Sequence, residues 1–232
     1  MFKNILSDER GSILPIMAVV IVILIGVSAV AVDYTRRAAA SEKLKTAGES
    51  AAVAGALSAT RYVRLSIDPG SYRTCCGVET CSPCCVDCGD VIIREGTEKE
   101  LIENNGYKKY CCSCGCGPVK IINRWVEYEG NNAELAAEMF FNANKPKEMS
   151  ADQGGASSIT KITTYQDRKS PYYPSVVVET TGKVKTLFMS FLNTMAPGVD
   201  FSYLNSKKCS QGLTYYYDLN GKWHRTAEDP CN

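Results

Sequence analysis

Residues 11–32 read GSILPIMAVVIVILIGVSAVAV and contain no charged side chain. A helix rises 1.5 Å per residue, so a helix of this length is about 30 Å long, which is the thickness of the hydrocarbon core of a bilayer. A backbone in lipid must satisfy its hydrogen bonds internally, and Pro15 is tolerated because it lies in the first turn. The stretch therefore predicts a transmembrane helix over residues 11–32, preceded by a cytoplasmic N-terminus over residues 1–10.

The following residues, 33–65, contain no proline and continue the helical pattern. They predict a stalk helix that ends near residue 65, where Asp68-Pro69-Gly70 forms a strong turn signal. Small or apolar residues recur on one face of this stalk at helical spacing. This helix-packing stripe consists of Ala40, Leu44, Ala47, Ala51, Ala54 and Ser58. The stripe has two interpretations: it covers the protein's own head, or it packs against another subunit.

Twelve cysteines dominate the rest of the sequence. They are Cys75, Cys76, Cys81, Cys84, Cys85, Cys88, Cys111, Cys112, Cys114, Cys116, Cys209 and Cys231. Such density in a membrane-anchored protein indicates an oxidising compartment. Adjacent cysteines rarely bond to each other because the geometry is strained, so residues 66–118 are expected to form an insertion in which disulfides tie the first cluster to the second. The spacing does not define the pairing, whereas Cys209 and Cys231 are expected to bond to each other.

A thiolate metal site is the alternative use of these cysteines. Cys81 with Cys84, and Cys111 with Cys114, have the C-x-x-C spacing of zinc ligands. With ten clustered cysteines such spacings arise easily, and no histidine lies nearby. Structural disulfides are therefore favoured over zinc or redox chemistry, and no cofactor is expected.

The charges flanking the apolar run conflict with the cysteines about topology. Lys3 and Arg10 precede the run, whereas Arg36, Arg37, Lys43 and Lys45 follow it, which by the positive-inside rule would place the C-terminal side in the cytoplasm. Clustered thiols would be a liability there, so the head is expected outside the cytoplasm. A cleaved signal peptide is the rival interpretation, because Ala29-Val30-Ala31 has the form of a cleavage site, but the apolar run is longer than a usual signal core.

Residues 119–208 predict a small α+β head with an antiparallel sheet. Within it, strands are expected at 158–167, 174–186 and 199–205 after a first strand at 119–128, with a short apolar helix at 187–195. Within the insertion 66–118, a short strand is expected at 91–94 and a helical turn at 98–104. A helix is expected over 133–144, with a core-facing stripe formed by Leu135, Ala136, Met139, Phe140 and Ala143. Residues 209–232 predict a C-terminal hairpin around the two-residue turn Asn220-Gly221.

Composition argues against several classes of function. The 26 Lys and Arg residues nearly balance the 25 Asp and Glu residues, for a net charge of +1, so nucleic-acid binding is not expected. The only histidine, His224, lies among aromatics on the predicted hairpin, where a surface or packing role is typical. The sequence has no G-x-S-x-G, H-E-x-x-H or phosphate-binding glycine loop, so neither an enzyme nor a small-molecule substrate is expected.

The segment ERGSILPIMAVVIVILIGVSAVAVDYTRR, followed by KLKTAGESAAVAGALSA, resembles the N-terminal segment of TadG-like proteins of the tight-adherence (Tad, or Flp) pilus-assembly system. A weaker similarity continues at AAEMFFNANKP and at VVVETTGKVKTLFMSFLNTMAPGVDFSYLNS. The resemblance implies a non-enzymatic, single-pass inner-membrane component of pilus assembly or secretion, with a periplasmic or extracellular head and a link to cell adhesion. Implied partners are the membrane, other pilus-assembly or pilin-like subunits, and further copies of itself.

The sequence departs from that family in two ways. The cysteine-rich insertion is not typical, and no D-x-S-x-S site of a von Willebrand A domain is present. Pseudopilin relatives carry Glu at the fifth position after a cleaved glycine, whereas counting from Gly11 that position is Ile16. Processing between Gly11 and Ser12 would favour a first alternative function, a pilin-like subunit assembled into a filament around its long helix. A membrane-tethered thiolate metal-binding or redox protein is the second alternative.

Overall fold

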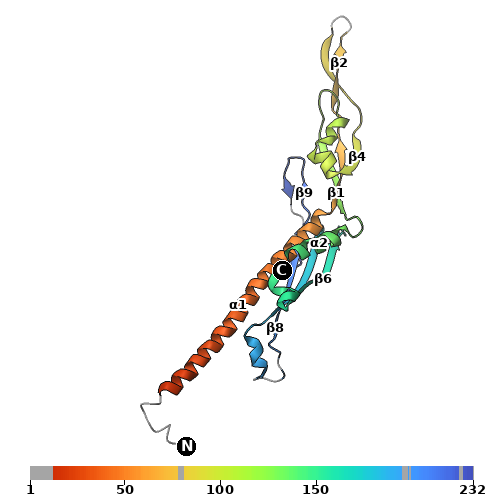
Figure 1. Ribbon diagram of the computed structural model, residues 1–232. Helices are drawn as coiled ribbons and strands as arrows, with labels where there is room; N and C mark the ends of the chain where they lie inside the picture. The colour runs from red at the N-terminus through yellow and green to blue at the C-terminus, as the bar shows by residue number, and fades with distance from the viewer. Residues whose placement is uncertain (1–12, 78–80, 195–197, 199, 225–226, 232) are drawn as a thin grey trace, which may run out of the picture. The chain divides into compact units, whose positions relative to one another are not determined.

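The computed structural model describes residues 13–77, 81–194, 198, 200–224 and 227–231 (Figure 1). The predicted cytoplasmic N-terminus and the candidate processing site at Gly11 and Ser12 lie outside these residues. The elements follow in the order α1 (Ile13–Leu57), β1 (Thr60–Ile67), β2 (Ser71–Cys76), β3 (Ser82–Asp87), β4 (Ile92–Thr97), η2 (Lys99–Glu103), η3 (Gly106–Tyr110), β5 (Val119–Glu127), α2 (Asn132–Asn144), η4 (Lys147–Met149), η5 (Ala151–Gln153), β6 (Ala156–Tyr165), β7 (Ser175–Lys185), η6 (Met189–Thr194), β8 (Tyr203–Leu213), β9 (Tyr216–Tyr217) and β10 (Trp223–His224). A long apolar helix followed by small antiparallel sheets and a disulfide-rich insertion confirms the predicted α+β class.

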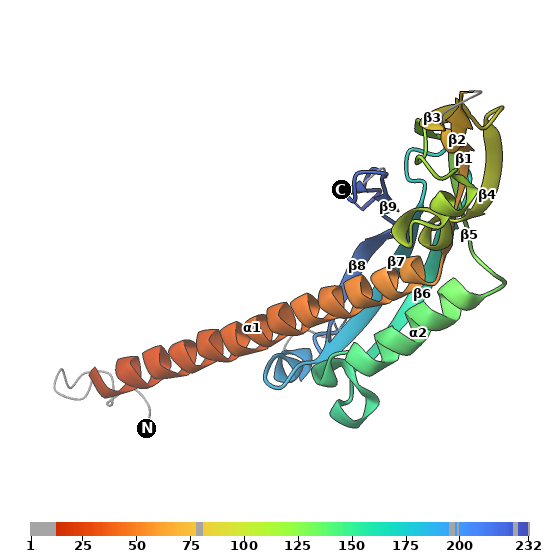
Figure 2. The ribbon, with the colours of Figure 1, turned by 90° about the horizontal axis from the view of Figure 1, so that it is seen from above.

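Helix α1 is 45 residues long and ends at Leu57, not near residue 65. Figure 2 shows that it runs without interruption. Ser58 closes it by donating from its hydroxyl to the carbonyl oxygen of Gly55 at 2.7 Å. The predicted end was wrong because residues 60–67 form a strand, in which buried side chains from Val63 to Ile67 alternate with an exposed and a half-buried one. Val63, Leu65 and Ile67 are the buried members of this strand.

The chain divides into two compact units, and several long elements contribute to both. The first unit contains residues 1–48, 142–160 and 179–209, and the second contains residues 49–141, 161–178 and 210–232. Strands β6, β7 and β8 form a three-stranded sheet with β7 in the centre.

The predicted stripe on α1 is buried by the protein's own fold. Ala40, Leu44, Ala47 and Ala51 have no exposed surface. In the first unit, a Cβ added at Gly182 of β7 would lie 3.1 Å from the Leu44 side chain. In the second unit, a Cβ at Gly212 of β8 would meet the Ala52 carbonyl oxygen at 1.9 Å. Of the two interpretations of the stripe, the structure shows the one in which it covers the chain's own head.

The second unit contains the antiparallel sheet β4-β1-β5, with β1 in the centre. Val63, Leu65 and Ile67 from β1 form its core together with Leu101 and Ile102 from η2. The predictions of a strand near residues 91–94, a helical turn at 98–104 and a strand at 119–128 are confirmed by β4, η2 and β5.

Helix α2 lies where it was predicted, but it buries a different face. Ala133, Ala137 and Phe141 are its buried residues. Leu135, Met139 and Phe140, which were predicted to face the core, have exposed fractions of 62%, 64% and 43%. The reason is close approach, because a Cβ added at Gly55 of α1 would lie 3.0 Å from the Ala133 carbonyl oxygen. At the point where α2 passes Gly55 a small side chain is needed, and the face that begins with Ala133 and continues to Phe141 is the buried one.

The C-terminal part differs from prediction in its boundaries. Strand β8 begins at Tyr203 and runs to Leu213, beyond the predicted 199–205, and Cys209 lies within it. The hairpin is the short pair β9 and β10, joined by residues 218–222 and not by the two-residue turn Asn220-Gly221. Asp218 shapes this loop, because its Oδ1 accepts hydrogen bonds from the backbone N–H groups of Asn220 and Lys222 at 2.9 and 2.8 Å.

Candidate functional site

The cysteine-rich insertion in the second unit is held by five disulfides among its ten cysteines. The pairs are Cys75–Cys81, Cys76–Cys84, Cys85–Cys114, Cys88–Cys112 and Cys111–Cys116. The first two lie within the hairpin β2–β3, the last within residues 111–116, and the other two join these segments. No bond links sequence neighbours, and two disulfides tie the clusters together, as the sequence predicts. Cys209 and Cys231 are also disulfide-bonded, and none of the twelve cysteines is free.

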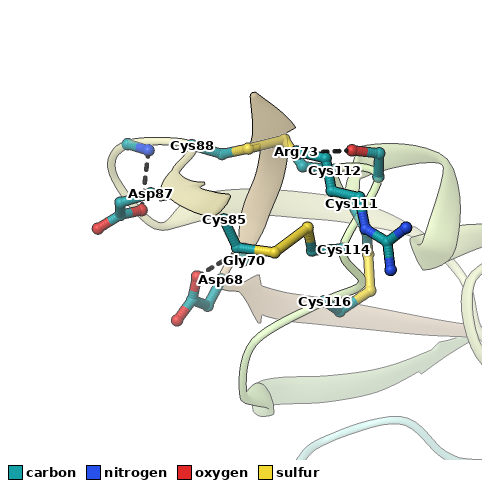
Figure 3. Close-up of a disulfide and its surroundings, with 12 residues drawn as sticks. Asp68, Gly70, Arg73, Cys85, Asp87, Cys88, Cys111, Cys112, Cys114 and Cys116 are labelled. Atoms are coloured by element: carbon teal, nitrogen blue, oxygen red, sulfur yellow. Dashed lines mark hydrogen bonds between the residues drawn. A yellow bond between two sulfur atoms is a disulfide. The ribbon is translucent and has the colours of Figure 1, made fainter. Parts of the chain in front are cut away.

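Figure 3 shows the disulfides Cys85–Cys114 and Cys88–Cys112 that join the two segments. Backbone hydrogen bonds also align these segments. The Cys112 N–H donates to the Pro69 carbonyl oxygen and the Cys114 N–H to that of Ser71, each at 2.9 Å. Gly70 is required at the turn, since its φ is +74° and a Cβ there would meet the Gly115 carbonyl oxygen at 2.0 Å. Disulfides and backbone bonds hold this insertion, because most side chains of β2 and β3 are exposed.

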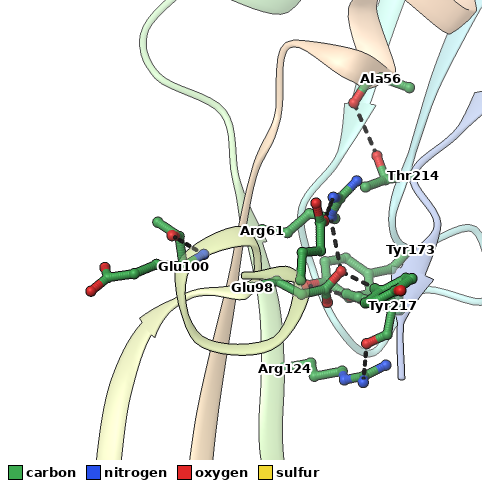
Figure 4. Close-up of polar contacts among 11 residues, drawn as sticks. Ala56, Arg61, Glu98, Glu100, Arg124, Tyr173, Thr214 and Tyr217 are labelled. Carbon is green, nitrogen blue, oxygen red and sulfur yellow. Dashed lines mark hydrogen bonds and ion pairs between the residues drawn. The ribbon is translucent and has the colours of Figure 1, made fainter. Parts of the chain in front are cut away.

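A buried carboxylate, Glu98, links three segments of the second unit (Figure 4). Its side chain has no exposed surface. Glu98 Oε1 accepts the Tyr217 backbone N–H at 2.7 Å and lies 3.1 Å from Arg61 Nε. The same guanidinium pairs through Nη2 with Glu103 at 2.6 Å. Glu98 thereby connects β1 and η2 to the C-terminal hairpin.

Aromatic rings and a second arginine complete this cluster. The Arg61 guanidinium lies 4.7 Å from the centre of the Trp223 ring, and Arg124 donates to the Tyr217 carbonyl oxygen at 2.5 Å. The Tyr173 hydroxyl accepts the Val126 N–H at 2.8 Å. Burial is the main cause that raises the pKa of Glu98, and it is opposed by the Tyr217 N–H and by Arg61. Because the carboxyl has no exposed surface and its partners belong to separate segments, this arrangement is suited to clamping the hairpin to β1 and η2.

Glu98→Gln tests the balance between burial and ion pairing. A raised folded-state pKa means that Glu98 stabilises the fold fully below its unfolded pKa of about 4.3, and less as pH rises through the folded value. We expect the free energy of unfolding of the glutamine variant to lie within about 1 kcal/mol of the wild-type value at pH 7. Between pH 4 and pH 7, the stability of the variant relative to wild type should increase. Urea unfolding of the full chain in detergent micelles, followed by tryptophan fluorescence, measures this.

Glu98→Ala is the matched control. It leaves the Tyr217 N–H without its acceptor and is expected to cost about 1–3 kcal/mol more than Glu98→Gln at every pH. A glutamine variant that loses more stability at pH 7 than at pH 4 would show that the ion pair outweighs burial.

His224 is an exposed residue of the hairpin, in agreement with the surface role predicted for it. Its Nε2 lies 2.8 Å from Asp218 Oδ2. This contact, followed by the Lys222 N–H, lowers the pKa of Asp218 to about 2. Among the described residues, no group of three or more His, Cys, Asp or Glu side chains is arranged to hold a metal ion.

Asp33 of α1 is the main polar anchor of the first unit, and the sequence assigned it no role. Its side chain is 2% exposed. Asp33 Oδ1 accepts the Leu187 N–H at 2.8 Å, and Oδ2 accepts the N–H groups of Phe188 and Met189 at 2.9 and 2.7 Å. The only sequence signal was its place as the first charge after the apolar run. Asp33 fixes the start of η6 against α1.

The part of α1 before Asp33 is long and apolar enough to cross a membrane. Its large side chains are exposed within the protein, including Ile16, Val22 and Ile25 at 60%, 69% and 63%. This distinguishes the segment from a buried core helix. Comparison of the chain with protein-family models, with curated proteins and with solved structures finds no match.

Proposed function

We propose that this protein is a non-enzymatic, membrane-anchored component of a Tad/Flp-type pilus assembly or secretion system. In this proposal residues 11–32 cross the inner membrane once and the disulfide-rich head lies in the periplasm or outside the cell. The head presents a contact surface to pilus-assembly or pilin-like subunits. The resemblance of residues 9–59 to TadG-like proteins suggests the system, and the anatomy of α1 supports the anchoring role.

The observation that carries the proposal is the change of environment along α1. Before Asp33 its large apolar side chains are exposed, whereas Ala40, Leu44 and Ala47 are fully buried. Leaving a large apolar side chain in water costs about 1.5–3 kcal/mol, so the exposed run amounts to tens of kcal/mol unless lipid or protein covers it. One helix thus combines an anchor with a rigid support for the head.

Burial of the stripe also restricts how partners are bound. Ala47 and Ala51 have no exposed surface, so they are not available to another subunit while the head is folded. Partner contacts are therefore assigned to the membrane-embedded part of α1 and to the head surface. Leucine at either position is expected to disturb the fold itself.

A pilin-like subunit remains the second candidate, and the continuity of α1 favours it. A filament subunit needs a helix that is apolar on all sides at one end and attached to a head at the other, and α1 has both features in one uninterrupted element. Removal of residues 1–11 would identify this alternative.

The thiolate metal or redox alternative depends on reduced cysteines. All ten cysteines of the insertion have their sulfur atoms in disulfides, and sulfur in a disulfide is not a thiolate ligand. Alkylation before reduction counts the free thiols of the protein from its native membrane. Stoichiometric alkylation together with bound zinc would replace the proposed function.

The proposal is tested in the cell that makes the protein. Removing the chain is expected to abolish surface pili, and restoring it is expected to recover them, as counted by electron microscopy. The wild-type protein should stay in the membrane after alkaline carbonate washing, with a full-length intact mass. Unchanged pili would contradict the assembly role, and a mass that begins at Ser12 with the protein found in fibres would favour the pilin-like subunit.

A further inference from the structure

Three bulky apolar side chains are exposed around the start of η6 in the first unit. Leu187, Phe188 and Phe191 have exposed fractions of 57%, 46% and 48%. Full burial of an exposed side chain of this size is worth about 1.5–3 kcal/mol, and about half of that applies to each of these half-exposed ones. All three lie within one five-residue segment, and we call them the 187–191 patch.

This patch adjoins the apolar part of α1. Phe188 lines one side of a groove of about 380 Å³, whose other lining residues all belong to α1. These are Ile21, Leu24, Ile25, Ser28, Ala29 and Val32. All six lie inside the uncharged run 11–32. A bilayer that covers this side of α1 must therefore also reach Phe188.

The backbone around the patch has partners for its polar groups, as a segment at membrane depth requires. Asp33 accepts the N–H groups of residues 187–189 at 2.7–2.9 Å. The Thr186 N–H donates to the Ser202 carbonyl oxygen at 2.9 Å, and its hydroxyl to that of Phe201 at 2.8 Å. Asn193 Oδ1 accepts the Phe201 N–H at 2.8 Å. The backbone N–H groups of residues 186–189 and 201 are thus bonded within the protein, while the side chains of Leu187, Phe188 and Phe191 are left exposed.

Cationic side chains follow one turn further along α1. Arg37 donates to the Asn205 carbonyl oxygen through Nε at 3.1 Å and Nη2 at 2.8 Å. A guanidinium has five N–H donors, so Arg37 and neighbouring Arg36 have capacity for lipid phosphates. The order along α1 is apolar groove, Asp33 anchor and arginine pair, which matches the order of hydrocarbon, interface and headgroups in a leaflet.

We propose that the 187–191 patch is a second membrane contact, embedded in the acyl chains of the leaflet next to the head and fixed there by Asp33. The inference rests on the proposed membrane-spanning role of residues 11–32. The lipid occupies the groove between Phe188 and α1, so the first unit meets the bilayer at two places. Two contacts would fix the tilt of α1 relative to the membrane, which a single helix does not.

The test places an environment-sensitive NBD fluorophore on new cysteines in the full chain, reconstituted in phosphatidylcholine–phosphatidylglycerol vesicles. Leu187→Cys and Phe191→Cys probe the patch, Ile23→Cys probes the spanning segment, and Ala151→Cys is the exposed control on η5. None of the native cysteines is free, so intact mass must show one labelled thiol per chain. Lipids with a nitroxide high on the acyl chain quench labels at that depth.

We expect quenching at positions 187 and 191 to be at least threefold stronger than at 151, and position 23 to respond best to a deeper nitroxide. Quenching at 23 but not at 187 or 191 would overturn this inference while leaving the anchor intact. Quenching at none of the four positions would overturn both proposals. Labels at 187 and 191 that are shielded from water yet insensitive to the lipid nitroxide would show that protein, such as a second copy, covers the patch.

Discussion

Gly212→Ala is expected to abolish the native packing of the second unit. A Cβ at this position would lie 1.9 Å from the Ala52 carbonyl oxygen, 2.2 Å from the Ala52 carbonyl carbon and 2.6 Å from the Val53 nitrogen. These are backbone atoms of α1, so no flexible side chain can move aside. Either β8 or α1 must shift, and we expect a loss of more than about 4 kcal/mol, in the range of the most damaging single substitutions.

Thermal unfolding of the full chain in detergent micelles, followed by circular dichroism, measures this loss. Gly26→Ala is the matched control, because it adds the same methyl group to α1 at a place with nothing within 4 Å. We expect it to unfold like wild type. A Gly212→Ala protein with wild-type stability would show that α1 and β8 are further apart than the structure has them.

The long helix was the most predictable element because many consecutive residues indicate the same structure. Twenty-two consecutive uncharged residues at 11–32 predict a helix whether the run is a membrane span or, in the rival interpretation, the core of a signal peptide. Its end was harder to predict, since the residues from Thr60 carry a strand alternation immediately after a helical one. Only pairing with β4 and β5 on both sides shows that residues 60–67 form the central strand of a sheet.

The face of α2 was mispredicted for a different reason. Hydrophobicity alone predicts that Leu135 and Met139 lie on the buried face of α2. The structure instead buries Ala133 and Ala137, whose small side chains allow the backbones to approach closely. Close packing depends on where the partner has no side chain, and here Gly55 of α1 supplies that space. One sequence does not show which glycine will face which helix, so patterning alone favoured the larger side chains.

The polar anchors are the least visible in sequence. Glu98 acquires its partners from residues 61 and 217, and Asp33 acquires its partners from residues 187–189. In the sequence, Glu98 resembles an ordinary surface charge because other charged residues surround it. Asp33 resembles one because it is simply the first charge after the apolar run. Their roles depend on contacts between segments far apart in the chain, which spacing does not encode.

Removing the two disulfides that join the cysteine clusters is expected to release the hairpin β2–β3. The variant carries Cys85→Ser, Cys88→Ser, Cys112→Ser and Cys114→Ser. Cys85–Cys114 and Cys88–Cys112 close loops with separations of 29 and 24 residues, for which loop closure contributes about 3.5 kcal/mol each. Side chains in β2 and β3 are mostly exposed, so no apolar core compensates for the loss.

Hydrogen exchange measured by mass spectrometry shows which residues lose their structure in this variant. We expect amides of residues 71–76 and 82–87 to exchange at least 100-fold faster, while β1, whose Val63, Leu65 and Ile67 lie in an apolar core, keeps its protection. The matched control replaces Cys75, Cys76, Cys81 and Cys84, whose loops have separations of only 6 and 8 residues and contribute about 2 kcal/mol each. Because that control leaves both joining disulfides in place, residues 111–116 should stay protected. Equal deprotection of β1 in the first variant would mean that the insertion supports the sheet, and not the reverse.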